Sequence, residues 1–120
     1  MTDAPAPPAP DTAAARLARA PLLVRLLAAM QQNQASDLFL SEGRAPAARV
    51  HGVVRPLDQA PSTQEEIEEL LSLALLEEGR ARFDATGDLD TGLSLYDGRR
   101  FRLNLSRERG RVHIVARAVP

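Results

Sequence analysis

Apolar side chains that recur every three or four residues predict a first amphipathic helix near the start of the chain. It begins at Pro21, because the fixed φ of proline suits a first helical turn, and it ends at the polar residues 31–34. Its apolar positions are Leu23, Leu26, Leu27 and Met30. One face of this helix is therefore expected to pack on a core.

The same spacing predicts a second helix over residues 63–76. Ser62 and Thr63 are each followed three residues later by Glu, so two overlapping capping boxes are available to open this helix. Gly79 is expected to break the helical pattern, because glycine is a poor helix former. A short helix over residues 80–85 then follows and inserts Phe83 into the core.

Between these helices, and again after Gly87, the apolar residues alternate with polar ones, which predicts strands. The first group covers residues 36–40 and 47–57, and a tight turn or bulge at Gly52 divides the latter segment. The second group is a three-stranded meander over residues 89–95, 99–106 and 112–119, with turns at Asp97-Gly98 and Arg109-Gly110. This order of elements predicts an α+β fold, in which helices pack on one face of a mixed, largely antiparallel sheet.

The composition fits one folded domain, residues 21–120, preceded by a tail. Residues 1–20 contain eight Ala and four Pro and almost no large apolar side chain, so we expect them to be flexible. The net charge of −1 excludes polybasic and disordered acidic chains as a description of the whole protein. No apolar run is long enough to cross a bilayer and no signal peptide is evident, so we expect a cytoplasmic protein without membrane insertion.

Several kinds of chemistry are excluded by absent residues. All 15 basic residues are arginine and cysteine is absent, so a P-loop, a Schiff base, a disulfide and a Cys-ligated metal are excluded. His51 and His113 lack metal-ligand spacing and are expected to be surface or strand-packing residues. Asp88 and Asp90 have no acid–base partner, and Asp37 is expected to cap a local turn. We expect no metal site and no catalysis by this chain alone.

Charge is unevenly distributed along the chain. Residues 62–90 contain nine carboxylates and two arginines, whereas residues 91–120 contain seven arginines and two carboxylates. The acidic residues are expected to form a solvated helix face. The basic residues gather on the last hairpin, but aromatic residues are too few to support base stacking there, so no nucleic-acid partner is expected.

The last hairpin is expected to set two arginines side by side. A two-residue turn at Arg109-Gly110 places Arg102 directly opposite Arg117, on the face that alternation directs away from the core. Two hypotheses stay open: the two arginines together bind a phosphate or carboxylate, or each pairs with a local carboxylate such as Asp88 or Asp90. Because like charges opposed across a sheet are destabilising, replacing either arginine by Ala is expected to leave the domain at least as stable.

Four short motifs occur in order over residues 22–120. They are ASDLFL with the following Gly43, the turn RVHG, the helix over residues 63–76, and RRFRLN running into VARAVP. Together they resemble the N-terminal domain of the twitching-motility (PilT-like) retraction ATPases, within the type II and type IV secretion ATPase family.

The resemblance implies a PAS-like α+β domain that precedes a RecA-like motor core in a hexameric, cytoplasmic ATPase at the base of a type IV pilus. In that family the domain packs on the neighbouring motor core, and its arginines reach toward the bound ATP. Arg102, Arg117 and, as a third, Arg100 match positions of such arginines and are implied to sense phosphate in trans. Family motif positions with structural or interface roles match Ser36, Asp37, Leu38, Gly43, Arg49 and Gly52. ATP and Mg²⁺ belong to the parent family, and this chain alone is expected to bind no cofactor.

Two features depart from the family pattern. Phe39 stands where the family has a His, so the local contact is expected to be apolar. The chain stops at Pro120, where the motor core would begin. The expected function is a non-catalytic assembly and nucleotide-sensing module, with the motor core of the same or a neighbouring subunit and inner-membrane platform proteins as partners. The alternative is a free-standing PAS-like interaction or ligand-binding regulatory domain.

Overall fold

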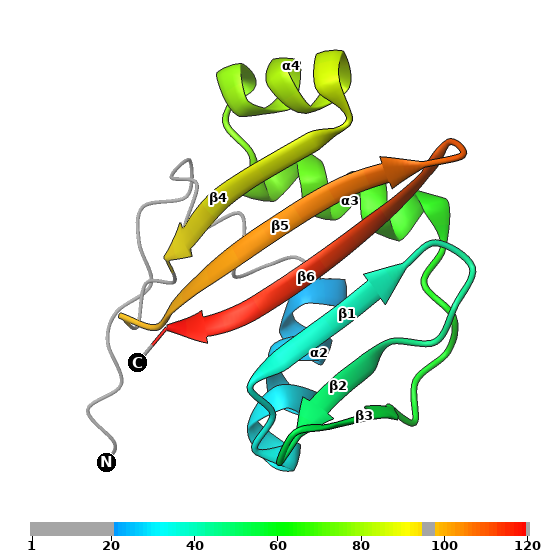
Figure 1. The fold of residues 1–120 in the computed structure, drawn as a ribbon, viewed down its shortest axis with the longest axis vertical. Coiled ribbons are helices and arrows are strands. Elements are labelled where there is room, and N and C mark those ends of the chain that lie inside the picture. The colour runs from blue at the N-terminus through cyan, green and yellow to red at the C-terminus, as the bar shows by residue number, and fades with distance from the viewer. Residues whose placement is uncertain (1–20, 95–97, 120) are drawn as a thin grey trace.

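The computed structural model describes residues 21–94 and 98–119, and Figure 1 shows how they are arranged. Residues 1–20, predicted to be a flexible tail, lie outside the described residues. Within the described residues the chain forms three helices and six strands. In chain order these are α2 (Pro21–Asn33), β1 (Asp37–Ser41), β2 (Ala47–Val50), β3 (Val53–Pro56), α3 (Gln64–Ala74), α4 (Glu77–Thr86), β4 (Asp88–Ser94), β5 (Arg100–Glu108) and β6 (Arg111–Val119).

The strands form one open sheet in the order β3-β2-β1-β6-β5-β4. Every neighbouring pair in this order is antiparallel. Two three-stranded meanders, β1 to β3 and β4 to β6, meet where β1 pairs with β6 (Figure 1). The α+β class predicted from the sequence is confirmed.

Two-residue turns fix the register of two hairpins. His51 and Gly52 have φ values of 50° and 80°, and Arg109 and Gly110 have values of 52° and 78°. Positive φ at both central residues gives the turn whose twist matches that of the flanking strands, and glycine adopts it without strain. The predicted turns at Gly52 and at Arg109-Gly110 are therefore confirmed, whereas Asp97 of the third predicted turn lies outside the described residues.

Helices α2 and α3 lie behind the sheet in Figure 1 and cover one of its faces. An ion pair of 3.2 Å between Arg25 Nη2 and Glu66 Oε2 joins the two helices. The core contains Leu22, Leu26, Leu27, Met30, Ile67, Leu70, Leu71 and Phe83 from the helices, and Leu38, Leu40, Leu89, Leu93, Phe101, Leu103, Leu105, Val112, Ile114 and Ala116 from the strands. The apolar face predicted for the first helix is thus confirmed at Leu26, Leu27 and Met30, while the side chain of Leu23 is not among those described.

Thr63 caps α3 in a reciprocal capping box. Its Oγ1 accepts a hydrogen bond from the Glu66 N–H at 3.1 Å, and its own N–H donates to Glu66 Oε1 at 3.0 Å. The backbone hydrogen bond from Thr63 lowers the pKa of Glu66, and the neighbouring Arg25 adds to this against the opposing effect of burial. Of the two predicted boxes, the one that begins at Thr63 forms, because Ser62 pairs its backbone with Gly43 and Arg44.

The predicted start of the short second helix was wrong. The chain turns at Leu75 and Leu76, which are both extended, and α4 already begins at Glu77, so Gly79 lies inside this helix. Leu75 packs against the core, and the two glutamates at positions 77 and 78 suit the positive end of the new helix dipole. The packing of Leu75 and the charges of the two glutamates therefore determine where α3 ends and α4 begins. Phe83 is fully buried, as predicted.

Candidate functional site on the open face of the sheet

A row of residues crosses all six strands on the face of the sheet that the helices leave open. Strand register pairs Arg102 directly with Arg117, so the predicted juxtaposition of these two arginines is confirmed. Directly paired residues share a face of the sheet, because side chains alternate along each strand. From β4 to β3 the row consists of Gly92, Arg102, Arg117, Asp37, Arg49 and Val54.

Asp37 lies between two arginines of this row. Its Oδ1 accepts a hydrogen bond from Arg117 Nε at 2.9 Å, and its Oδ2 lies 3.3 Å from Arg49 Nε. Ser36 Oγ donates to Oδ2 at 2.8 Å. The Asp37 side chain is only 6% exposed, so these partners compensate a buried charge. The prediction that Asp37 caps a local turn was wrong, because strand pairing brings arginines of β2 and β6 to it.

The same contacts determine the charge state of Asp37. Burial alone would raise the pKa of this carboxyl, because it disfavours the ionised form. Hydrogen bonds from Arg117 and Ser36, together with the positive charges of Arg117 and Arg49, outweigh burial and hold the pKa below its ordinary value of 3.8. Asp37 is therefore ionised at neutral pH and neutralises part of the arginine row.

Arg102 differs from Arg117 in its partners. Among the described residues it makes no hydrogen bond or ion pair, whereas Arg117 is held by Asp37. Asp90, one of the two carboxylates considered as a partner, accepts a hydrogen bond from Asn104 Nδ2 at 2.9 Å. Neither Asp88 nor Asp90 forms an ion pair with an arginine in the part of the chain that the structure describes. The hypothesis that each arginine pairs with a carboxylate therefore holds for Arg117, whose partner is Asp37. Among the described residues it does not hold for Arg102.

Two open depressions flank Arg102. The first, of about 450 Å³, is lined by Asp90, Arg102, Leu103, Asn104, Val115 and Arg117. The second, of about 530 Å³, includes Gly92, Ser94, Arg100 and Val119. Guanidinium groups present planar forks of N–H donors that match the oxygens of phosphate and carboxylate. This part of the sheet is therefore suited to binding an oxyanion.

The remaining residues of the predicted family motifs support the fold around this site. Leu38 is buried in the core, and Gly43 and Gly52 adopt positive φ in turns. The Arg49 guanidinium lies 5.6 Å from the ring centroid of Phe39, so the environment of Phe39 is a cation–π contact as well as an apolar one.

His113 makes a contact that the sequence did not predict. Ser41 Oγ lies 2.7 Å from His113 Nδ1, across the β1–β6 pair. His113 thus packs between strands, and His51 is exposed in its turn, as expected for both. In the described segments, no group of three or more His, Asp or Glu side chains is arranged to hold a metal ion. None of the helices described here has the length and apolar character needed to span a membrane.

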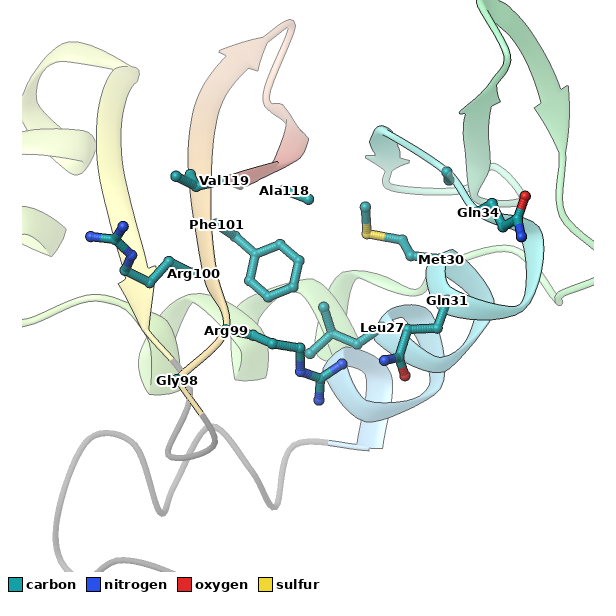
Figure 2. Close-up of a pocket in the computed structure, with 11 residues that line it drawn as sticks. Leu27, Met30, Gln31, Gln34, Gly98, Arg99, Arg100, Phe101, Ala118 and Val119 are labelled. Atoms are coloured by element: carbon teal, nitrogen blue, oxygen red, sulfur yellow. The ribbon is translucent and has the colours of Figure 1, made fainter. Parts of the chain in front are cut away.

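A separate groove lies between α2 and the end of the sheet where β5 begins and β6 ends, as Figure 2 shows. Its volume is about 590 Å³. Leu27, Met30 and Phe101 point into it, and Gln31 and Arg99 extend to one side of its rim (Figure 2). The groove is therefore apolar inside and polar at its mouth.

Comparison with known proteins relates the chain to motors of type IV pili. It is 28% identical over 95 residues to the type IV pilus ATPase PilU of Pseudomonas aeruginosa, a match that covers 79% of this chain and 25% of PilU. The crystal structure of the pilus retraction motor PilT with bound ADP superposes with a TM-score of 0.73 and 27% identity. The chain is a relative of the PilT-like ATPases. The resemblance predicted from the sequence is thereby confirmed.

Other comparisons bear on the fold alone. The ATPase DotB of Legionella pneumophila has a TM-score of 0.69 at 20% identity, over 82% of this chain and 29% of DotB. No family model matches the chain.

The match to PilT covers 82% of this chain and 29% of the PilT chain, as the match to DotB does. This chain thus spans between a quarter and a third of the length of PilU, PilT and DotB.

Proposed function

We propose that this chain is a non-catalytic N-terminal module of a type IV pilus or type II secretion ATPase, which assembles on a motor core and senses the nucleotide bound there. The observation that carries the proposal is the pairing of Arg102 with Arg117 on the open face of the sheet. Support comes from the similarity to a pilus motor that was solved with ADP. In this role the two arginines, with Arg100 beside them, meet the phosphates of a nucleotide held by the neighbouring subunit.

The two arginines play different parts in the proposal. Asp37 holds Arg117 through Nε, while the Arg117 side chain as a whole remains 70% exposed. Arg117 is therefore oriented before a ligand arrives, which reduces the side-chain entropy lost on binding. Arg102 has no competing partner among the described residues and is free to follow the phosphate.

The proposal includes the assembly that the resemblance implies. The module has a PAS-like fold and belongs to a hexameric, cytoplasmic motor involved in pilus retraction, peripheral to the inner membrane and in contact with platform proteins. ATP and Mg²⁺ are bound by the motor core. The chain itself contains no lysine for a P-loop, so it binds no ATP tightly on its own.

ATP turnover by a full-length motor that carries this chain tests the sensing role. Arg102→Gln is expected to lower turnover by about 10²-fold or more, because an arginine that meets the transferring phosphoryl group in trans contributes about 10³-fold in strong cases. Arg111→Gln is the matched control, since Arg111 lies on β6 six residues from Arg117, about 20 Å along the same face. Equal turnover by the two variants contradicts the proposal.

Phosphate release by the purified chain tests the non-catalytic part. The expected rate equals that of a buffer blank, because the chain has no lysine and no glycine-rich phosphate loop. Mg²⁺-dependent release above the blank contradicts this part of the proposal.

A free-standing ligand-binding regulatory domain is a second candidate, and the groove in Figure 2 favours it. A volume of about 590 Å³ lies within the range of small-molecule sites, and an apolar interior with a polar rim suits an amphipathic molecule. Saturable binding of anilinonaphthalene sulfonate that is lost in Met30→Arg and retained in Arg102→Gln supports this candidate. Equal binding by both variants argues against it.

A further inference from the structure

Gly92 occupies a strand position at which the fold does not require glycine. It lies within β4, directly opposite Arg102. Its φ is not in the positive range, and a Cβ placed on it would have no heavy atom within 4 Å. Glycine inside a strand is destabilising, because it has no side chain to pack and loses more backbone entropy than other residues. Neither backbone conformation nor crowding therefore accounts for this glycine.

The missing side chain opens the space beside Arg102. Directly opposed residues of antiparallel strands have Cβ atoms about 5 Å apart, so a side chain at position 92 would stand next to the Arg102 stem. The depression of about 530 Å³ includes Gly92, and the depression of about 450 Å³ reaches Arg117. Asp90 and Arg102 line both. We call the two depressions together the arginine trough.

The charges of the arginine trough point to a ligand with several oxyanion groups. The carboxylate in it, Asp90, accepts the amide hydrogen bond of Asn104. Arg100 and Arg102 are two residues apart on the same face of β5, about 6.6 Å along the strand, and Arg117 lies opposite Arg102. Three guanidinium groups thus line the trough. Together they cover more space than one phosphate needs, so they suit a ligand with consecutive phosphates.

We propose that Gly92 forms the entrance of the arginine trough. A chain of phosphate groups crosses the β4 edge at Gly92 and then meets Arg102, with Arg100 and Arg117 on either side. This inference rests on the proposed function, because it takes the phosphate chain of a nucleotide as the ligand. Its specific content is that Gly92 controls access. A side chain at this position closes the entrance without changing any charge.

Titration of the 120-residue chain with inorganic tripolyphosphate at low salt tests the proposal, with the Nε–Hε resonances of the arginines as the readout. Gly92→Thr is expected to weaken binding about fivefold and Arg102→Gln about tenfold, whereas Arg111→Gln changes it less than about twofold. Threonine favours strands, so the Gly92→Thr variant is expected to melt at or above the wild-type temperature. Gly92→Ala, with a smaller side chain, is expected to bind with intermediate affinity.

The outcomes separate this inference from the function on which it rests. If Gly92→Thr binds like wild type while Arg102→Gln binds more weakly, the proposed role of Gly92 as an entrance is overturned. The proposed phosphate sensing by Arg102 then stands. If wild type shows no saturable binding, or if Arg102→Gln and Arg111→Gln bind alike, the trough and its entrance at Gly92 are overturned. Phosphate sensing in trans is then decided by ATP turnover of the full-length motor with Arg102→Gln. ATP in place of tripolyphosphate is expected to give the same order of variants, and a different order overturns the entrance for nucleotides.

Discussion

Arg117→Ala is expected to destabilise the domain and Arg102→Ala is not, although the two arginines face each other on adjacent strands. The sequence alone predicted no loss for either, because it showed only two opposed positive charges. The structure adds the buried carboxylate of Asp37, which accepts a hydrogen bond from Arg117 Nε at 2.9 Å. Removing Arg117 leaves Asp37 with Ser36 and Arg49, and removing Arg102 leaves no described group without its partner.

The expected magnitude follows from the cost of losing one charged hydrogen bond. Such a bond contributes about 1.5–3 kcal/mol when it is shielded from solvent, and less where one partner is exposed, as Arg117 is. We expect Arg117→Ala to lower the free energy of unfolding by about 1–2 kcal/mol. The corresponding loss in melting temperature is roughly 5–10 °C for a domain of this size. For Arg102→Ala the change is expected to stay within about 0.5 kcal/mol.

The difference between the two variants is expected to depend on pH. Because the pKa of Asp37 is lowered in the folded protein, the stability that its ionised form contributes is fully present above the ordinary carboxyl value of 3.8. It is lost as the pH falls through the lower, folded-state value. Urea unfolding of wild type and both variants at pH 7, and again in acid below the folded-state pKa, measures this. The gap between the variants is expected at pH 7 and should shrink in acid.

Two results would refute this reasoning. Equal urea midpoints for the two variants at pH 7 would show that Asp37 does not need Arg117. A gap that persists unchanged in acid would show that Arg117 stabilises the sheet by packing and not through the ionised carboxylate. Asp37→Asn separates these cases, because Arg117→Ala is expected to cost little more in that background.

Three further changes test the fold. Gly79→Ala is expected to raise the stability of the domain by about 0.5–1 kcal/mol, because the residue is helical and its new Cβ would lie 3.7 Å from Leu89 Cδ2, an ordinary contact; a lower melting temperature contradicts this. Phe83→Ala is expected to cost about 3–5 kcal/mol and to speed amide exchange in α4, whose buried anchor it is, so unchanged exchange in α4 argues against that role. Thr63→Ala is expected to lower the free energy of unfolding by about 1 kcal/mol through loss of the α3 cap, and an unchanged urea midpoint would show that the capping box is dispensable.

Local features of the fold could be predicted from the sequence because short-range rules determine them. The turn at Arg109-Gly110 fixes the register of β5 against β6, and this register alone places Arg102 opposite Arg117. The short helix predicted over residues 80–85 likewise placed Phe83 in the core, where it is fully buried. These predictions depend only on residues that are close together in the sequence.

Features that depend on distant segments could not be predicted in this way. The pairing of β1 with β6 joins Asp37 to Arg117, 80 positions later in the chain, and no local pattern specifies it. Local patterns therefore predict a turn-capping role for Asp37, and they do not predict the contact between Ser41 and His113 for the same reason. Helix propensity alone predicts the helix break at Gly79, whereas the packing of Leu75 against the core moves it to Leu75 and Leu76.

The most direct test of the proposed trans-acting role is to mix two inactive motors. One carries Arg102→Gln and an intact ATP site, and the other carries Arg102 and an inactivated ATP site. If Arg102 meets the nucleotide of the neighbouring subunit, mixed assemblies are expected to regain ATP turnover, with the largest recovery near equal amounts of the two subunits. No recovery at any ratio, in assemblies that contain both subunits, contradicts the proposed role of Arg102.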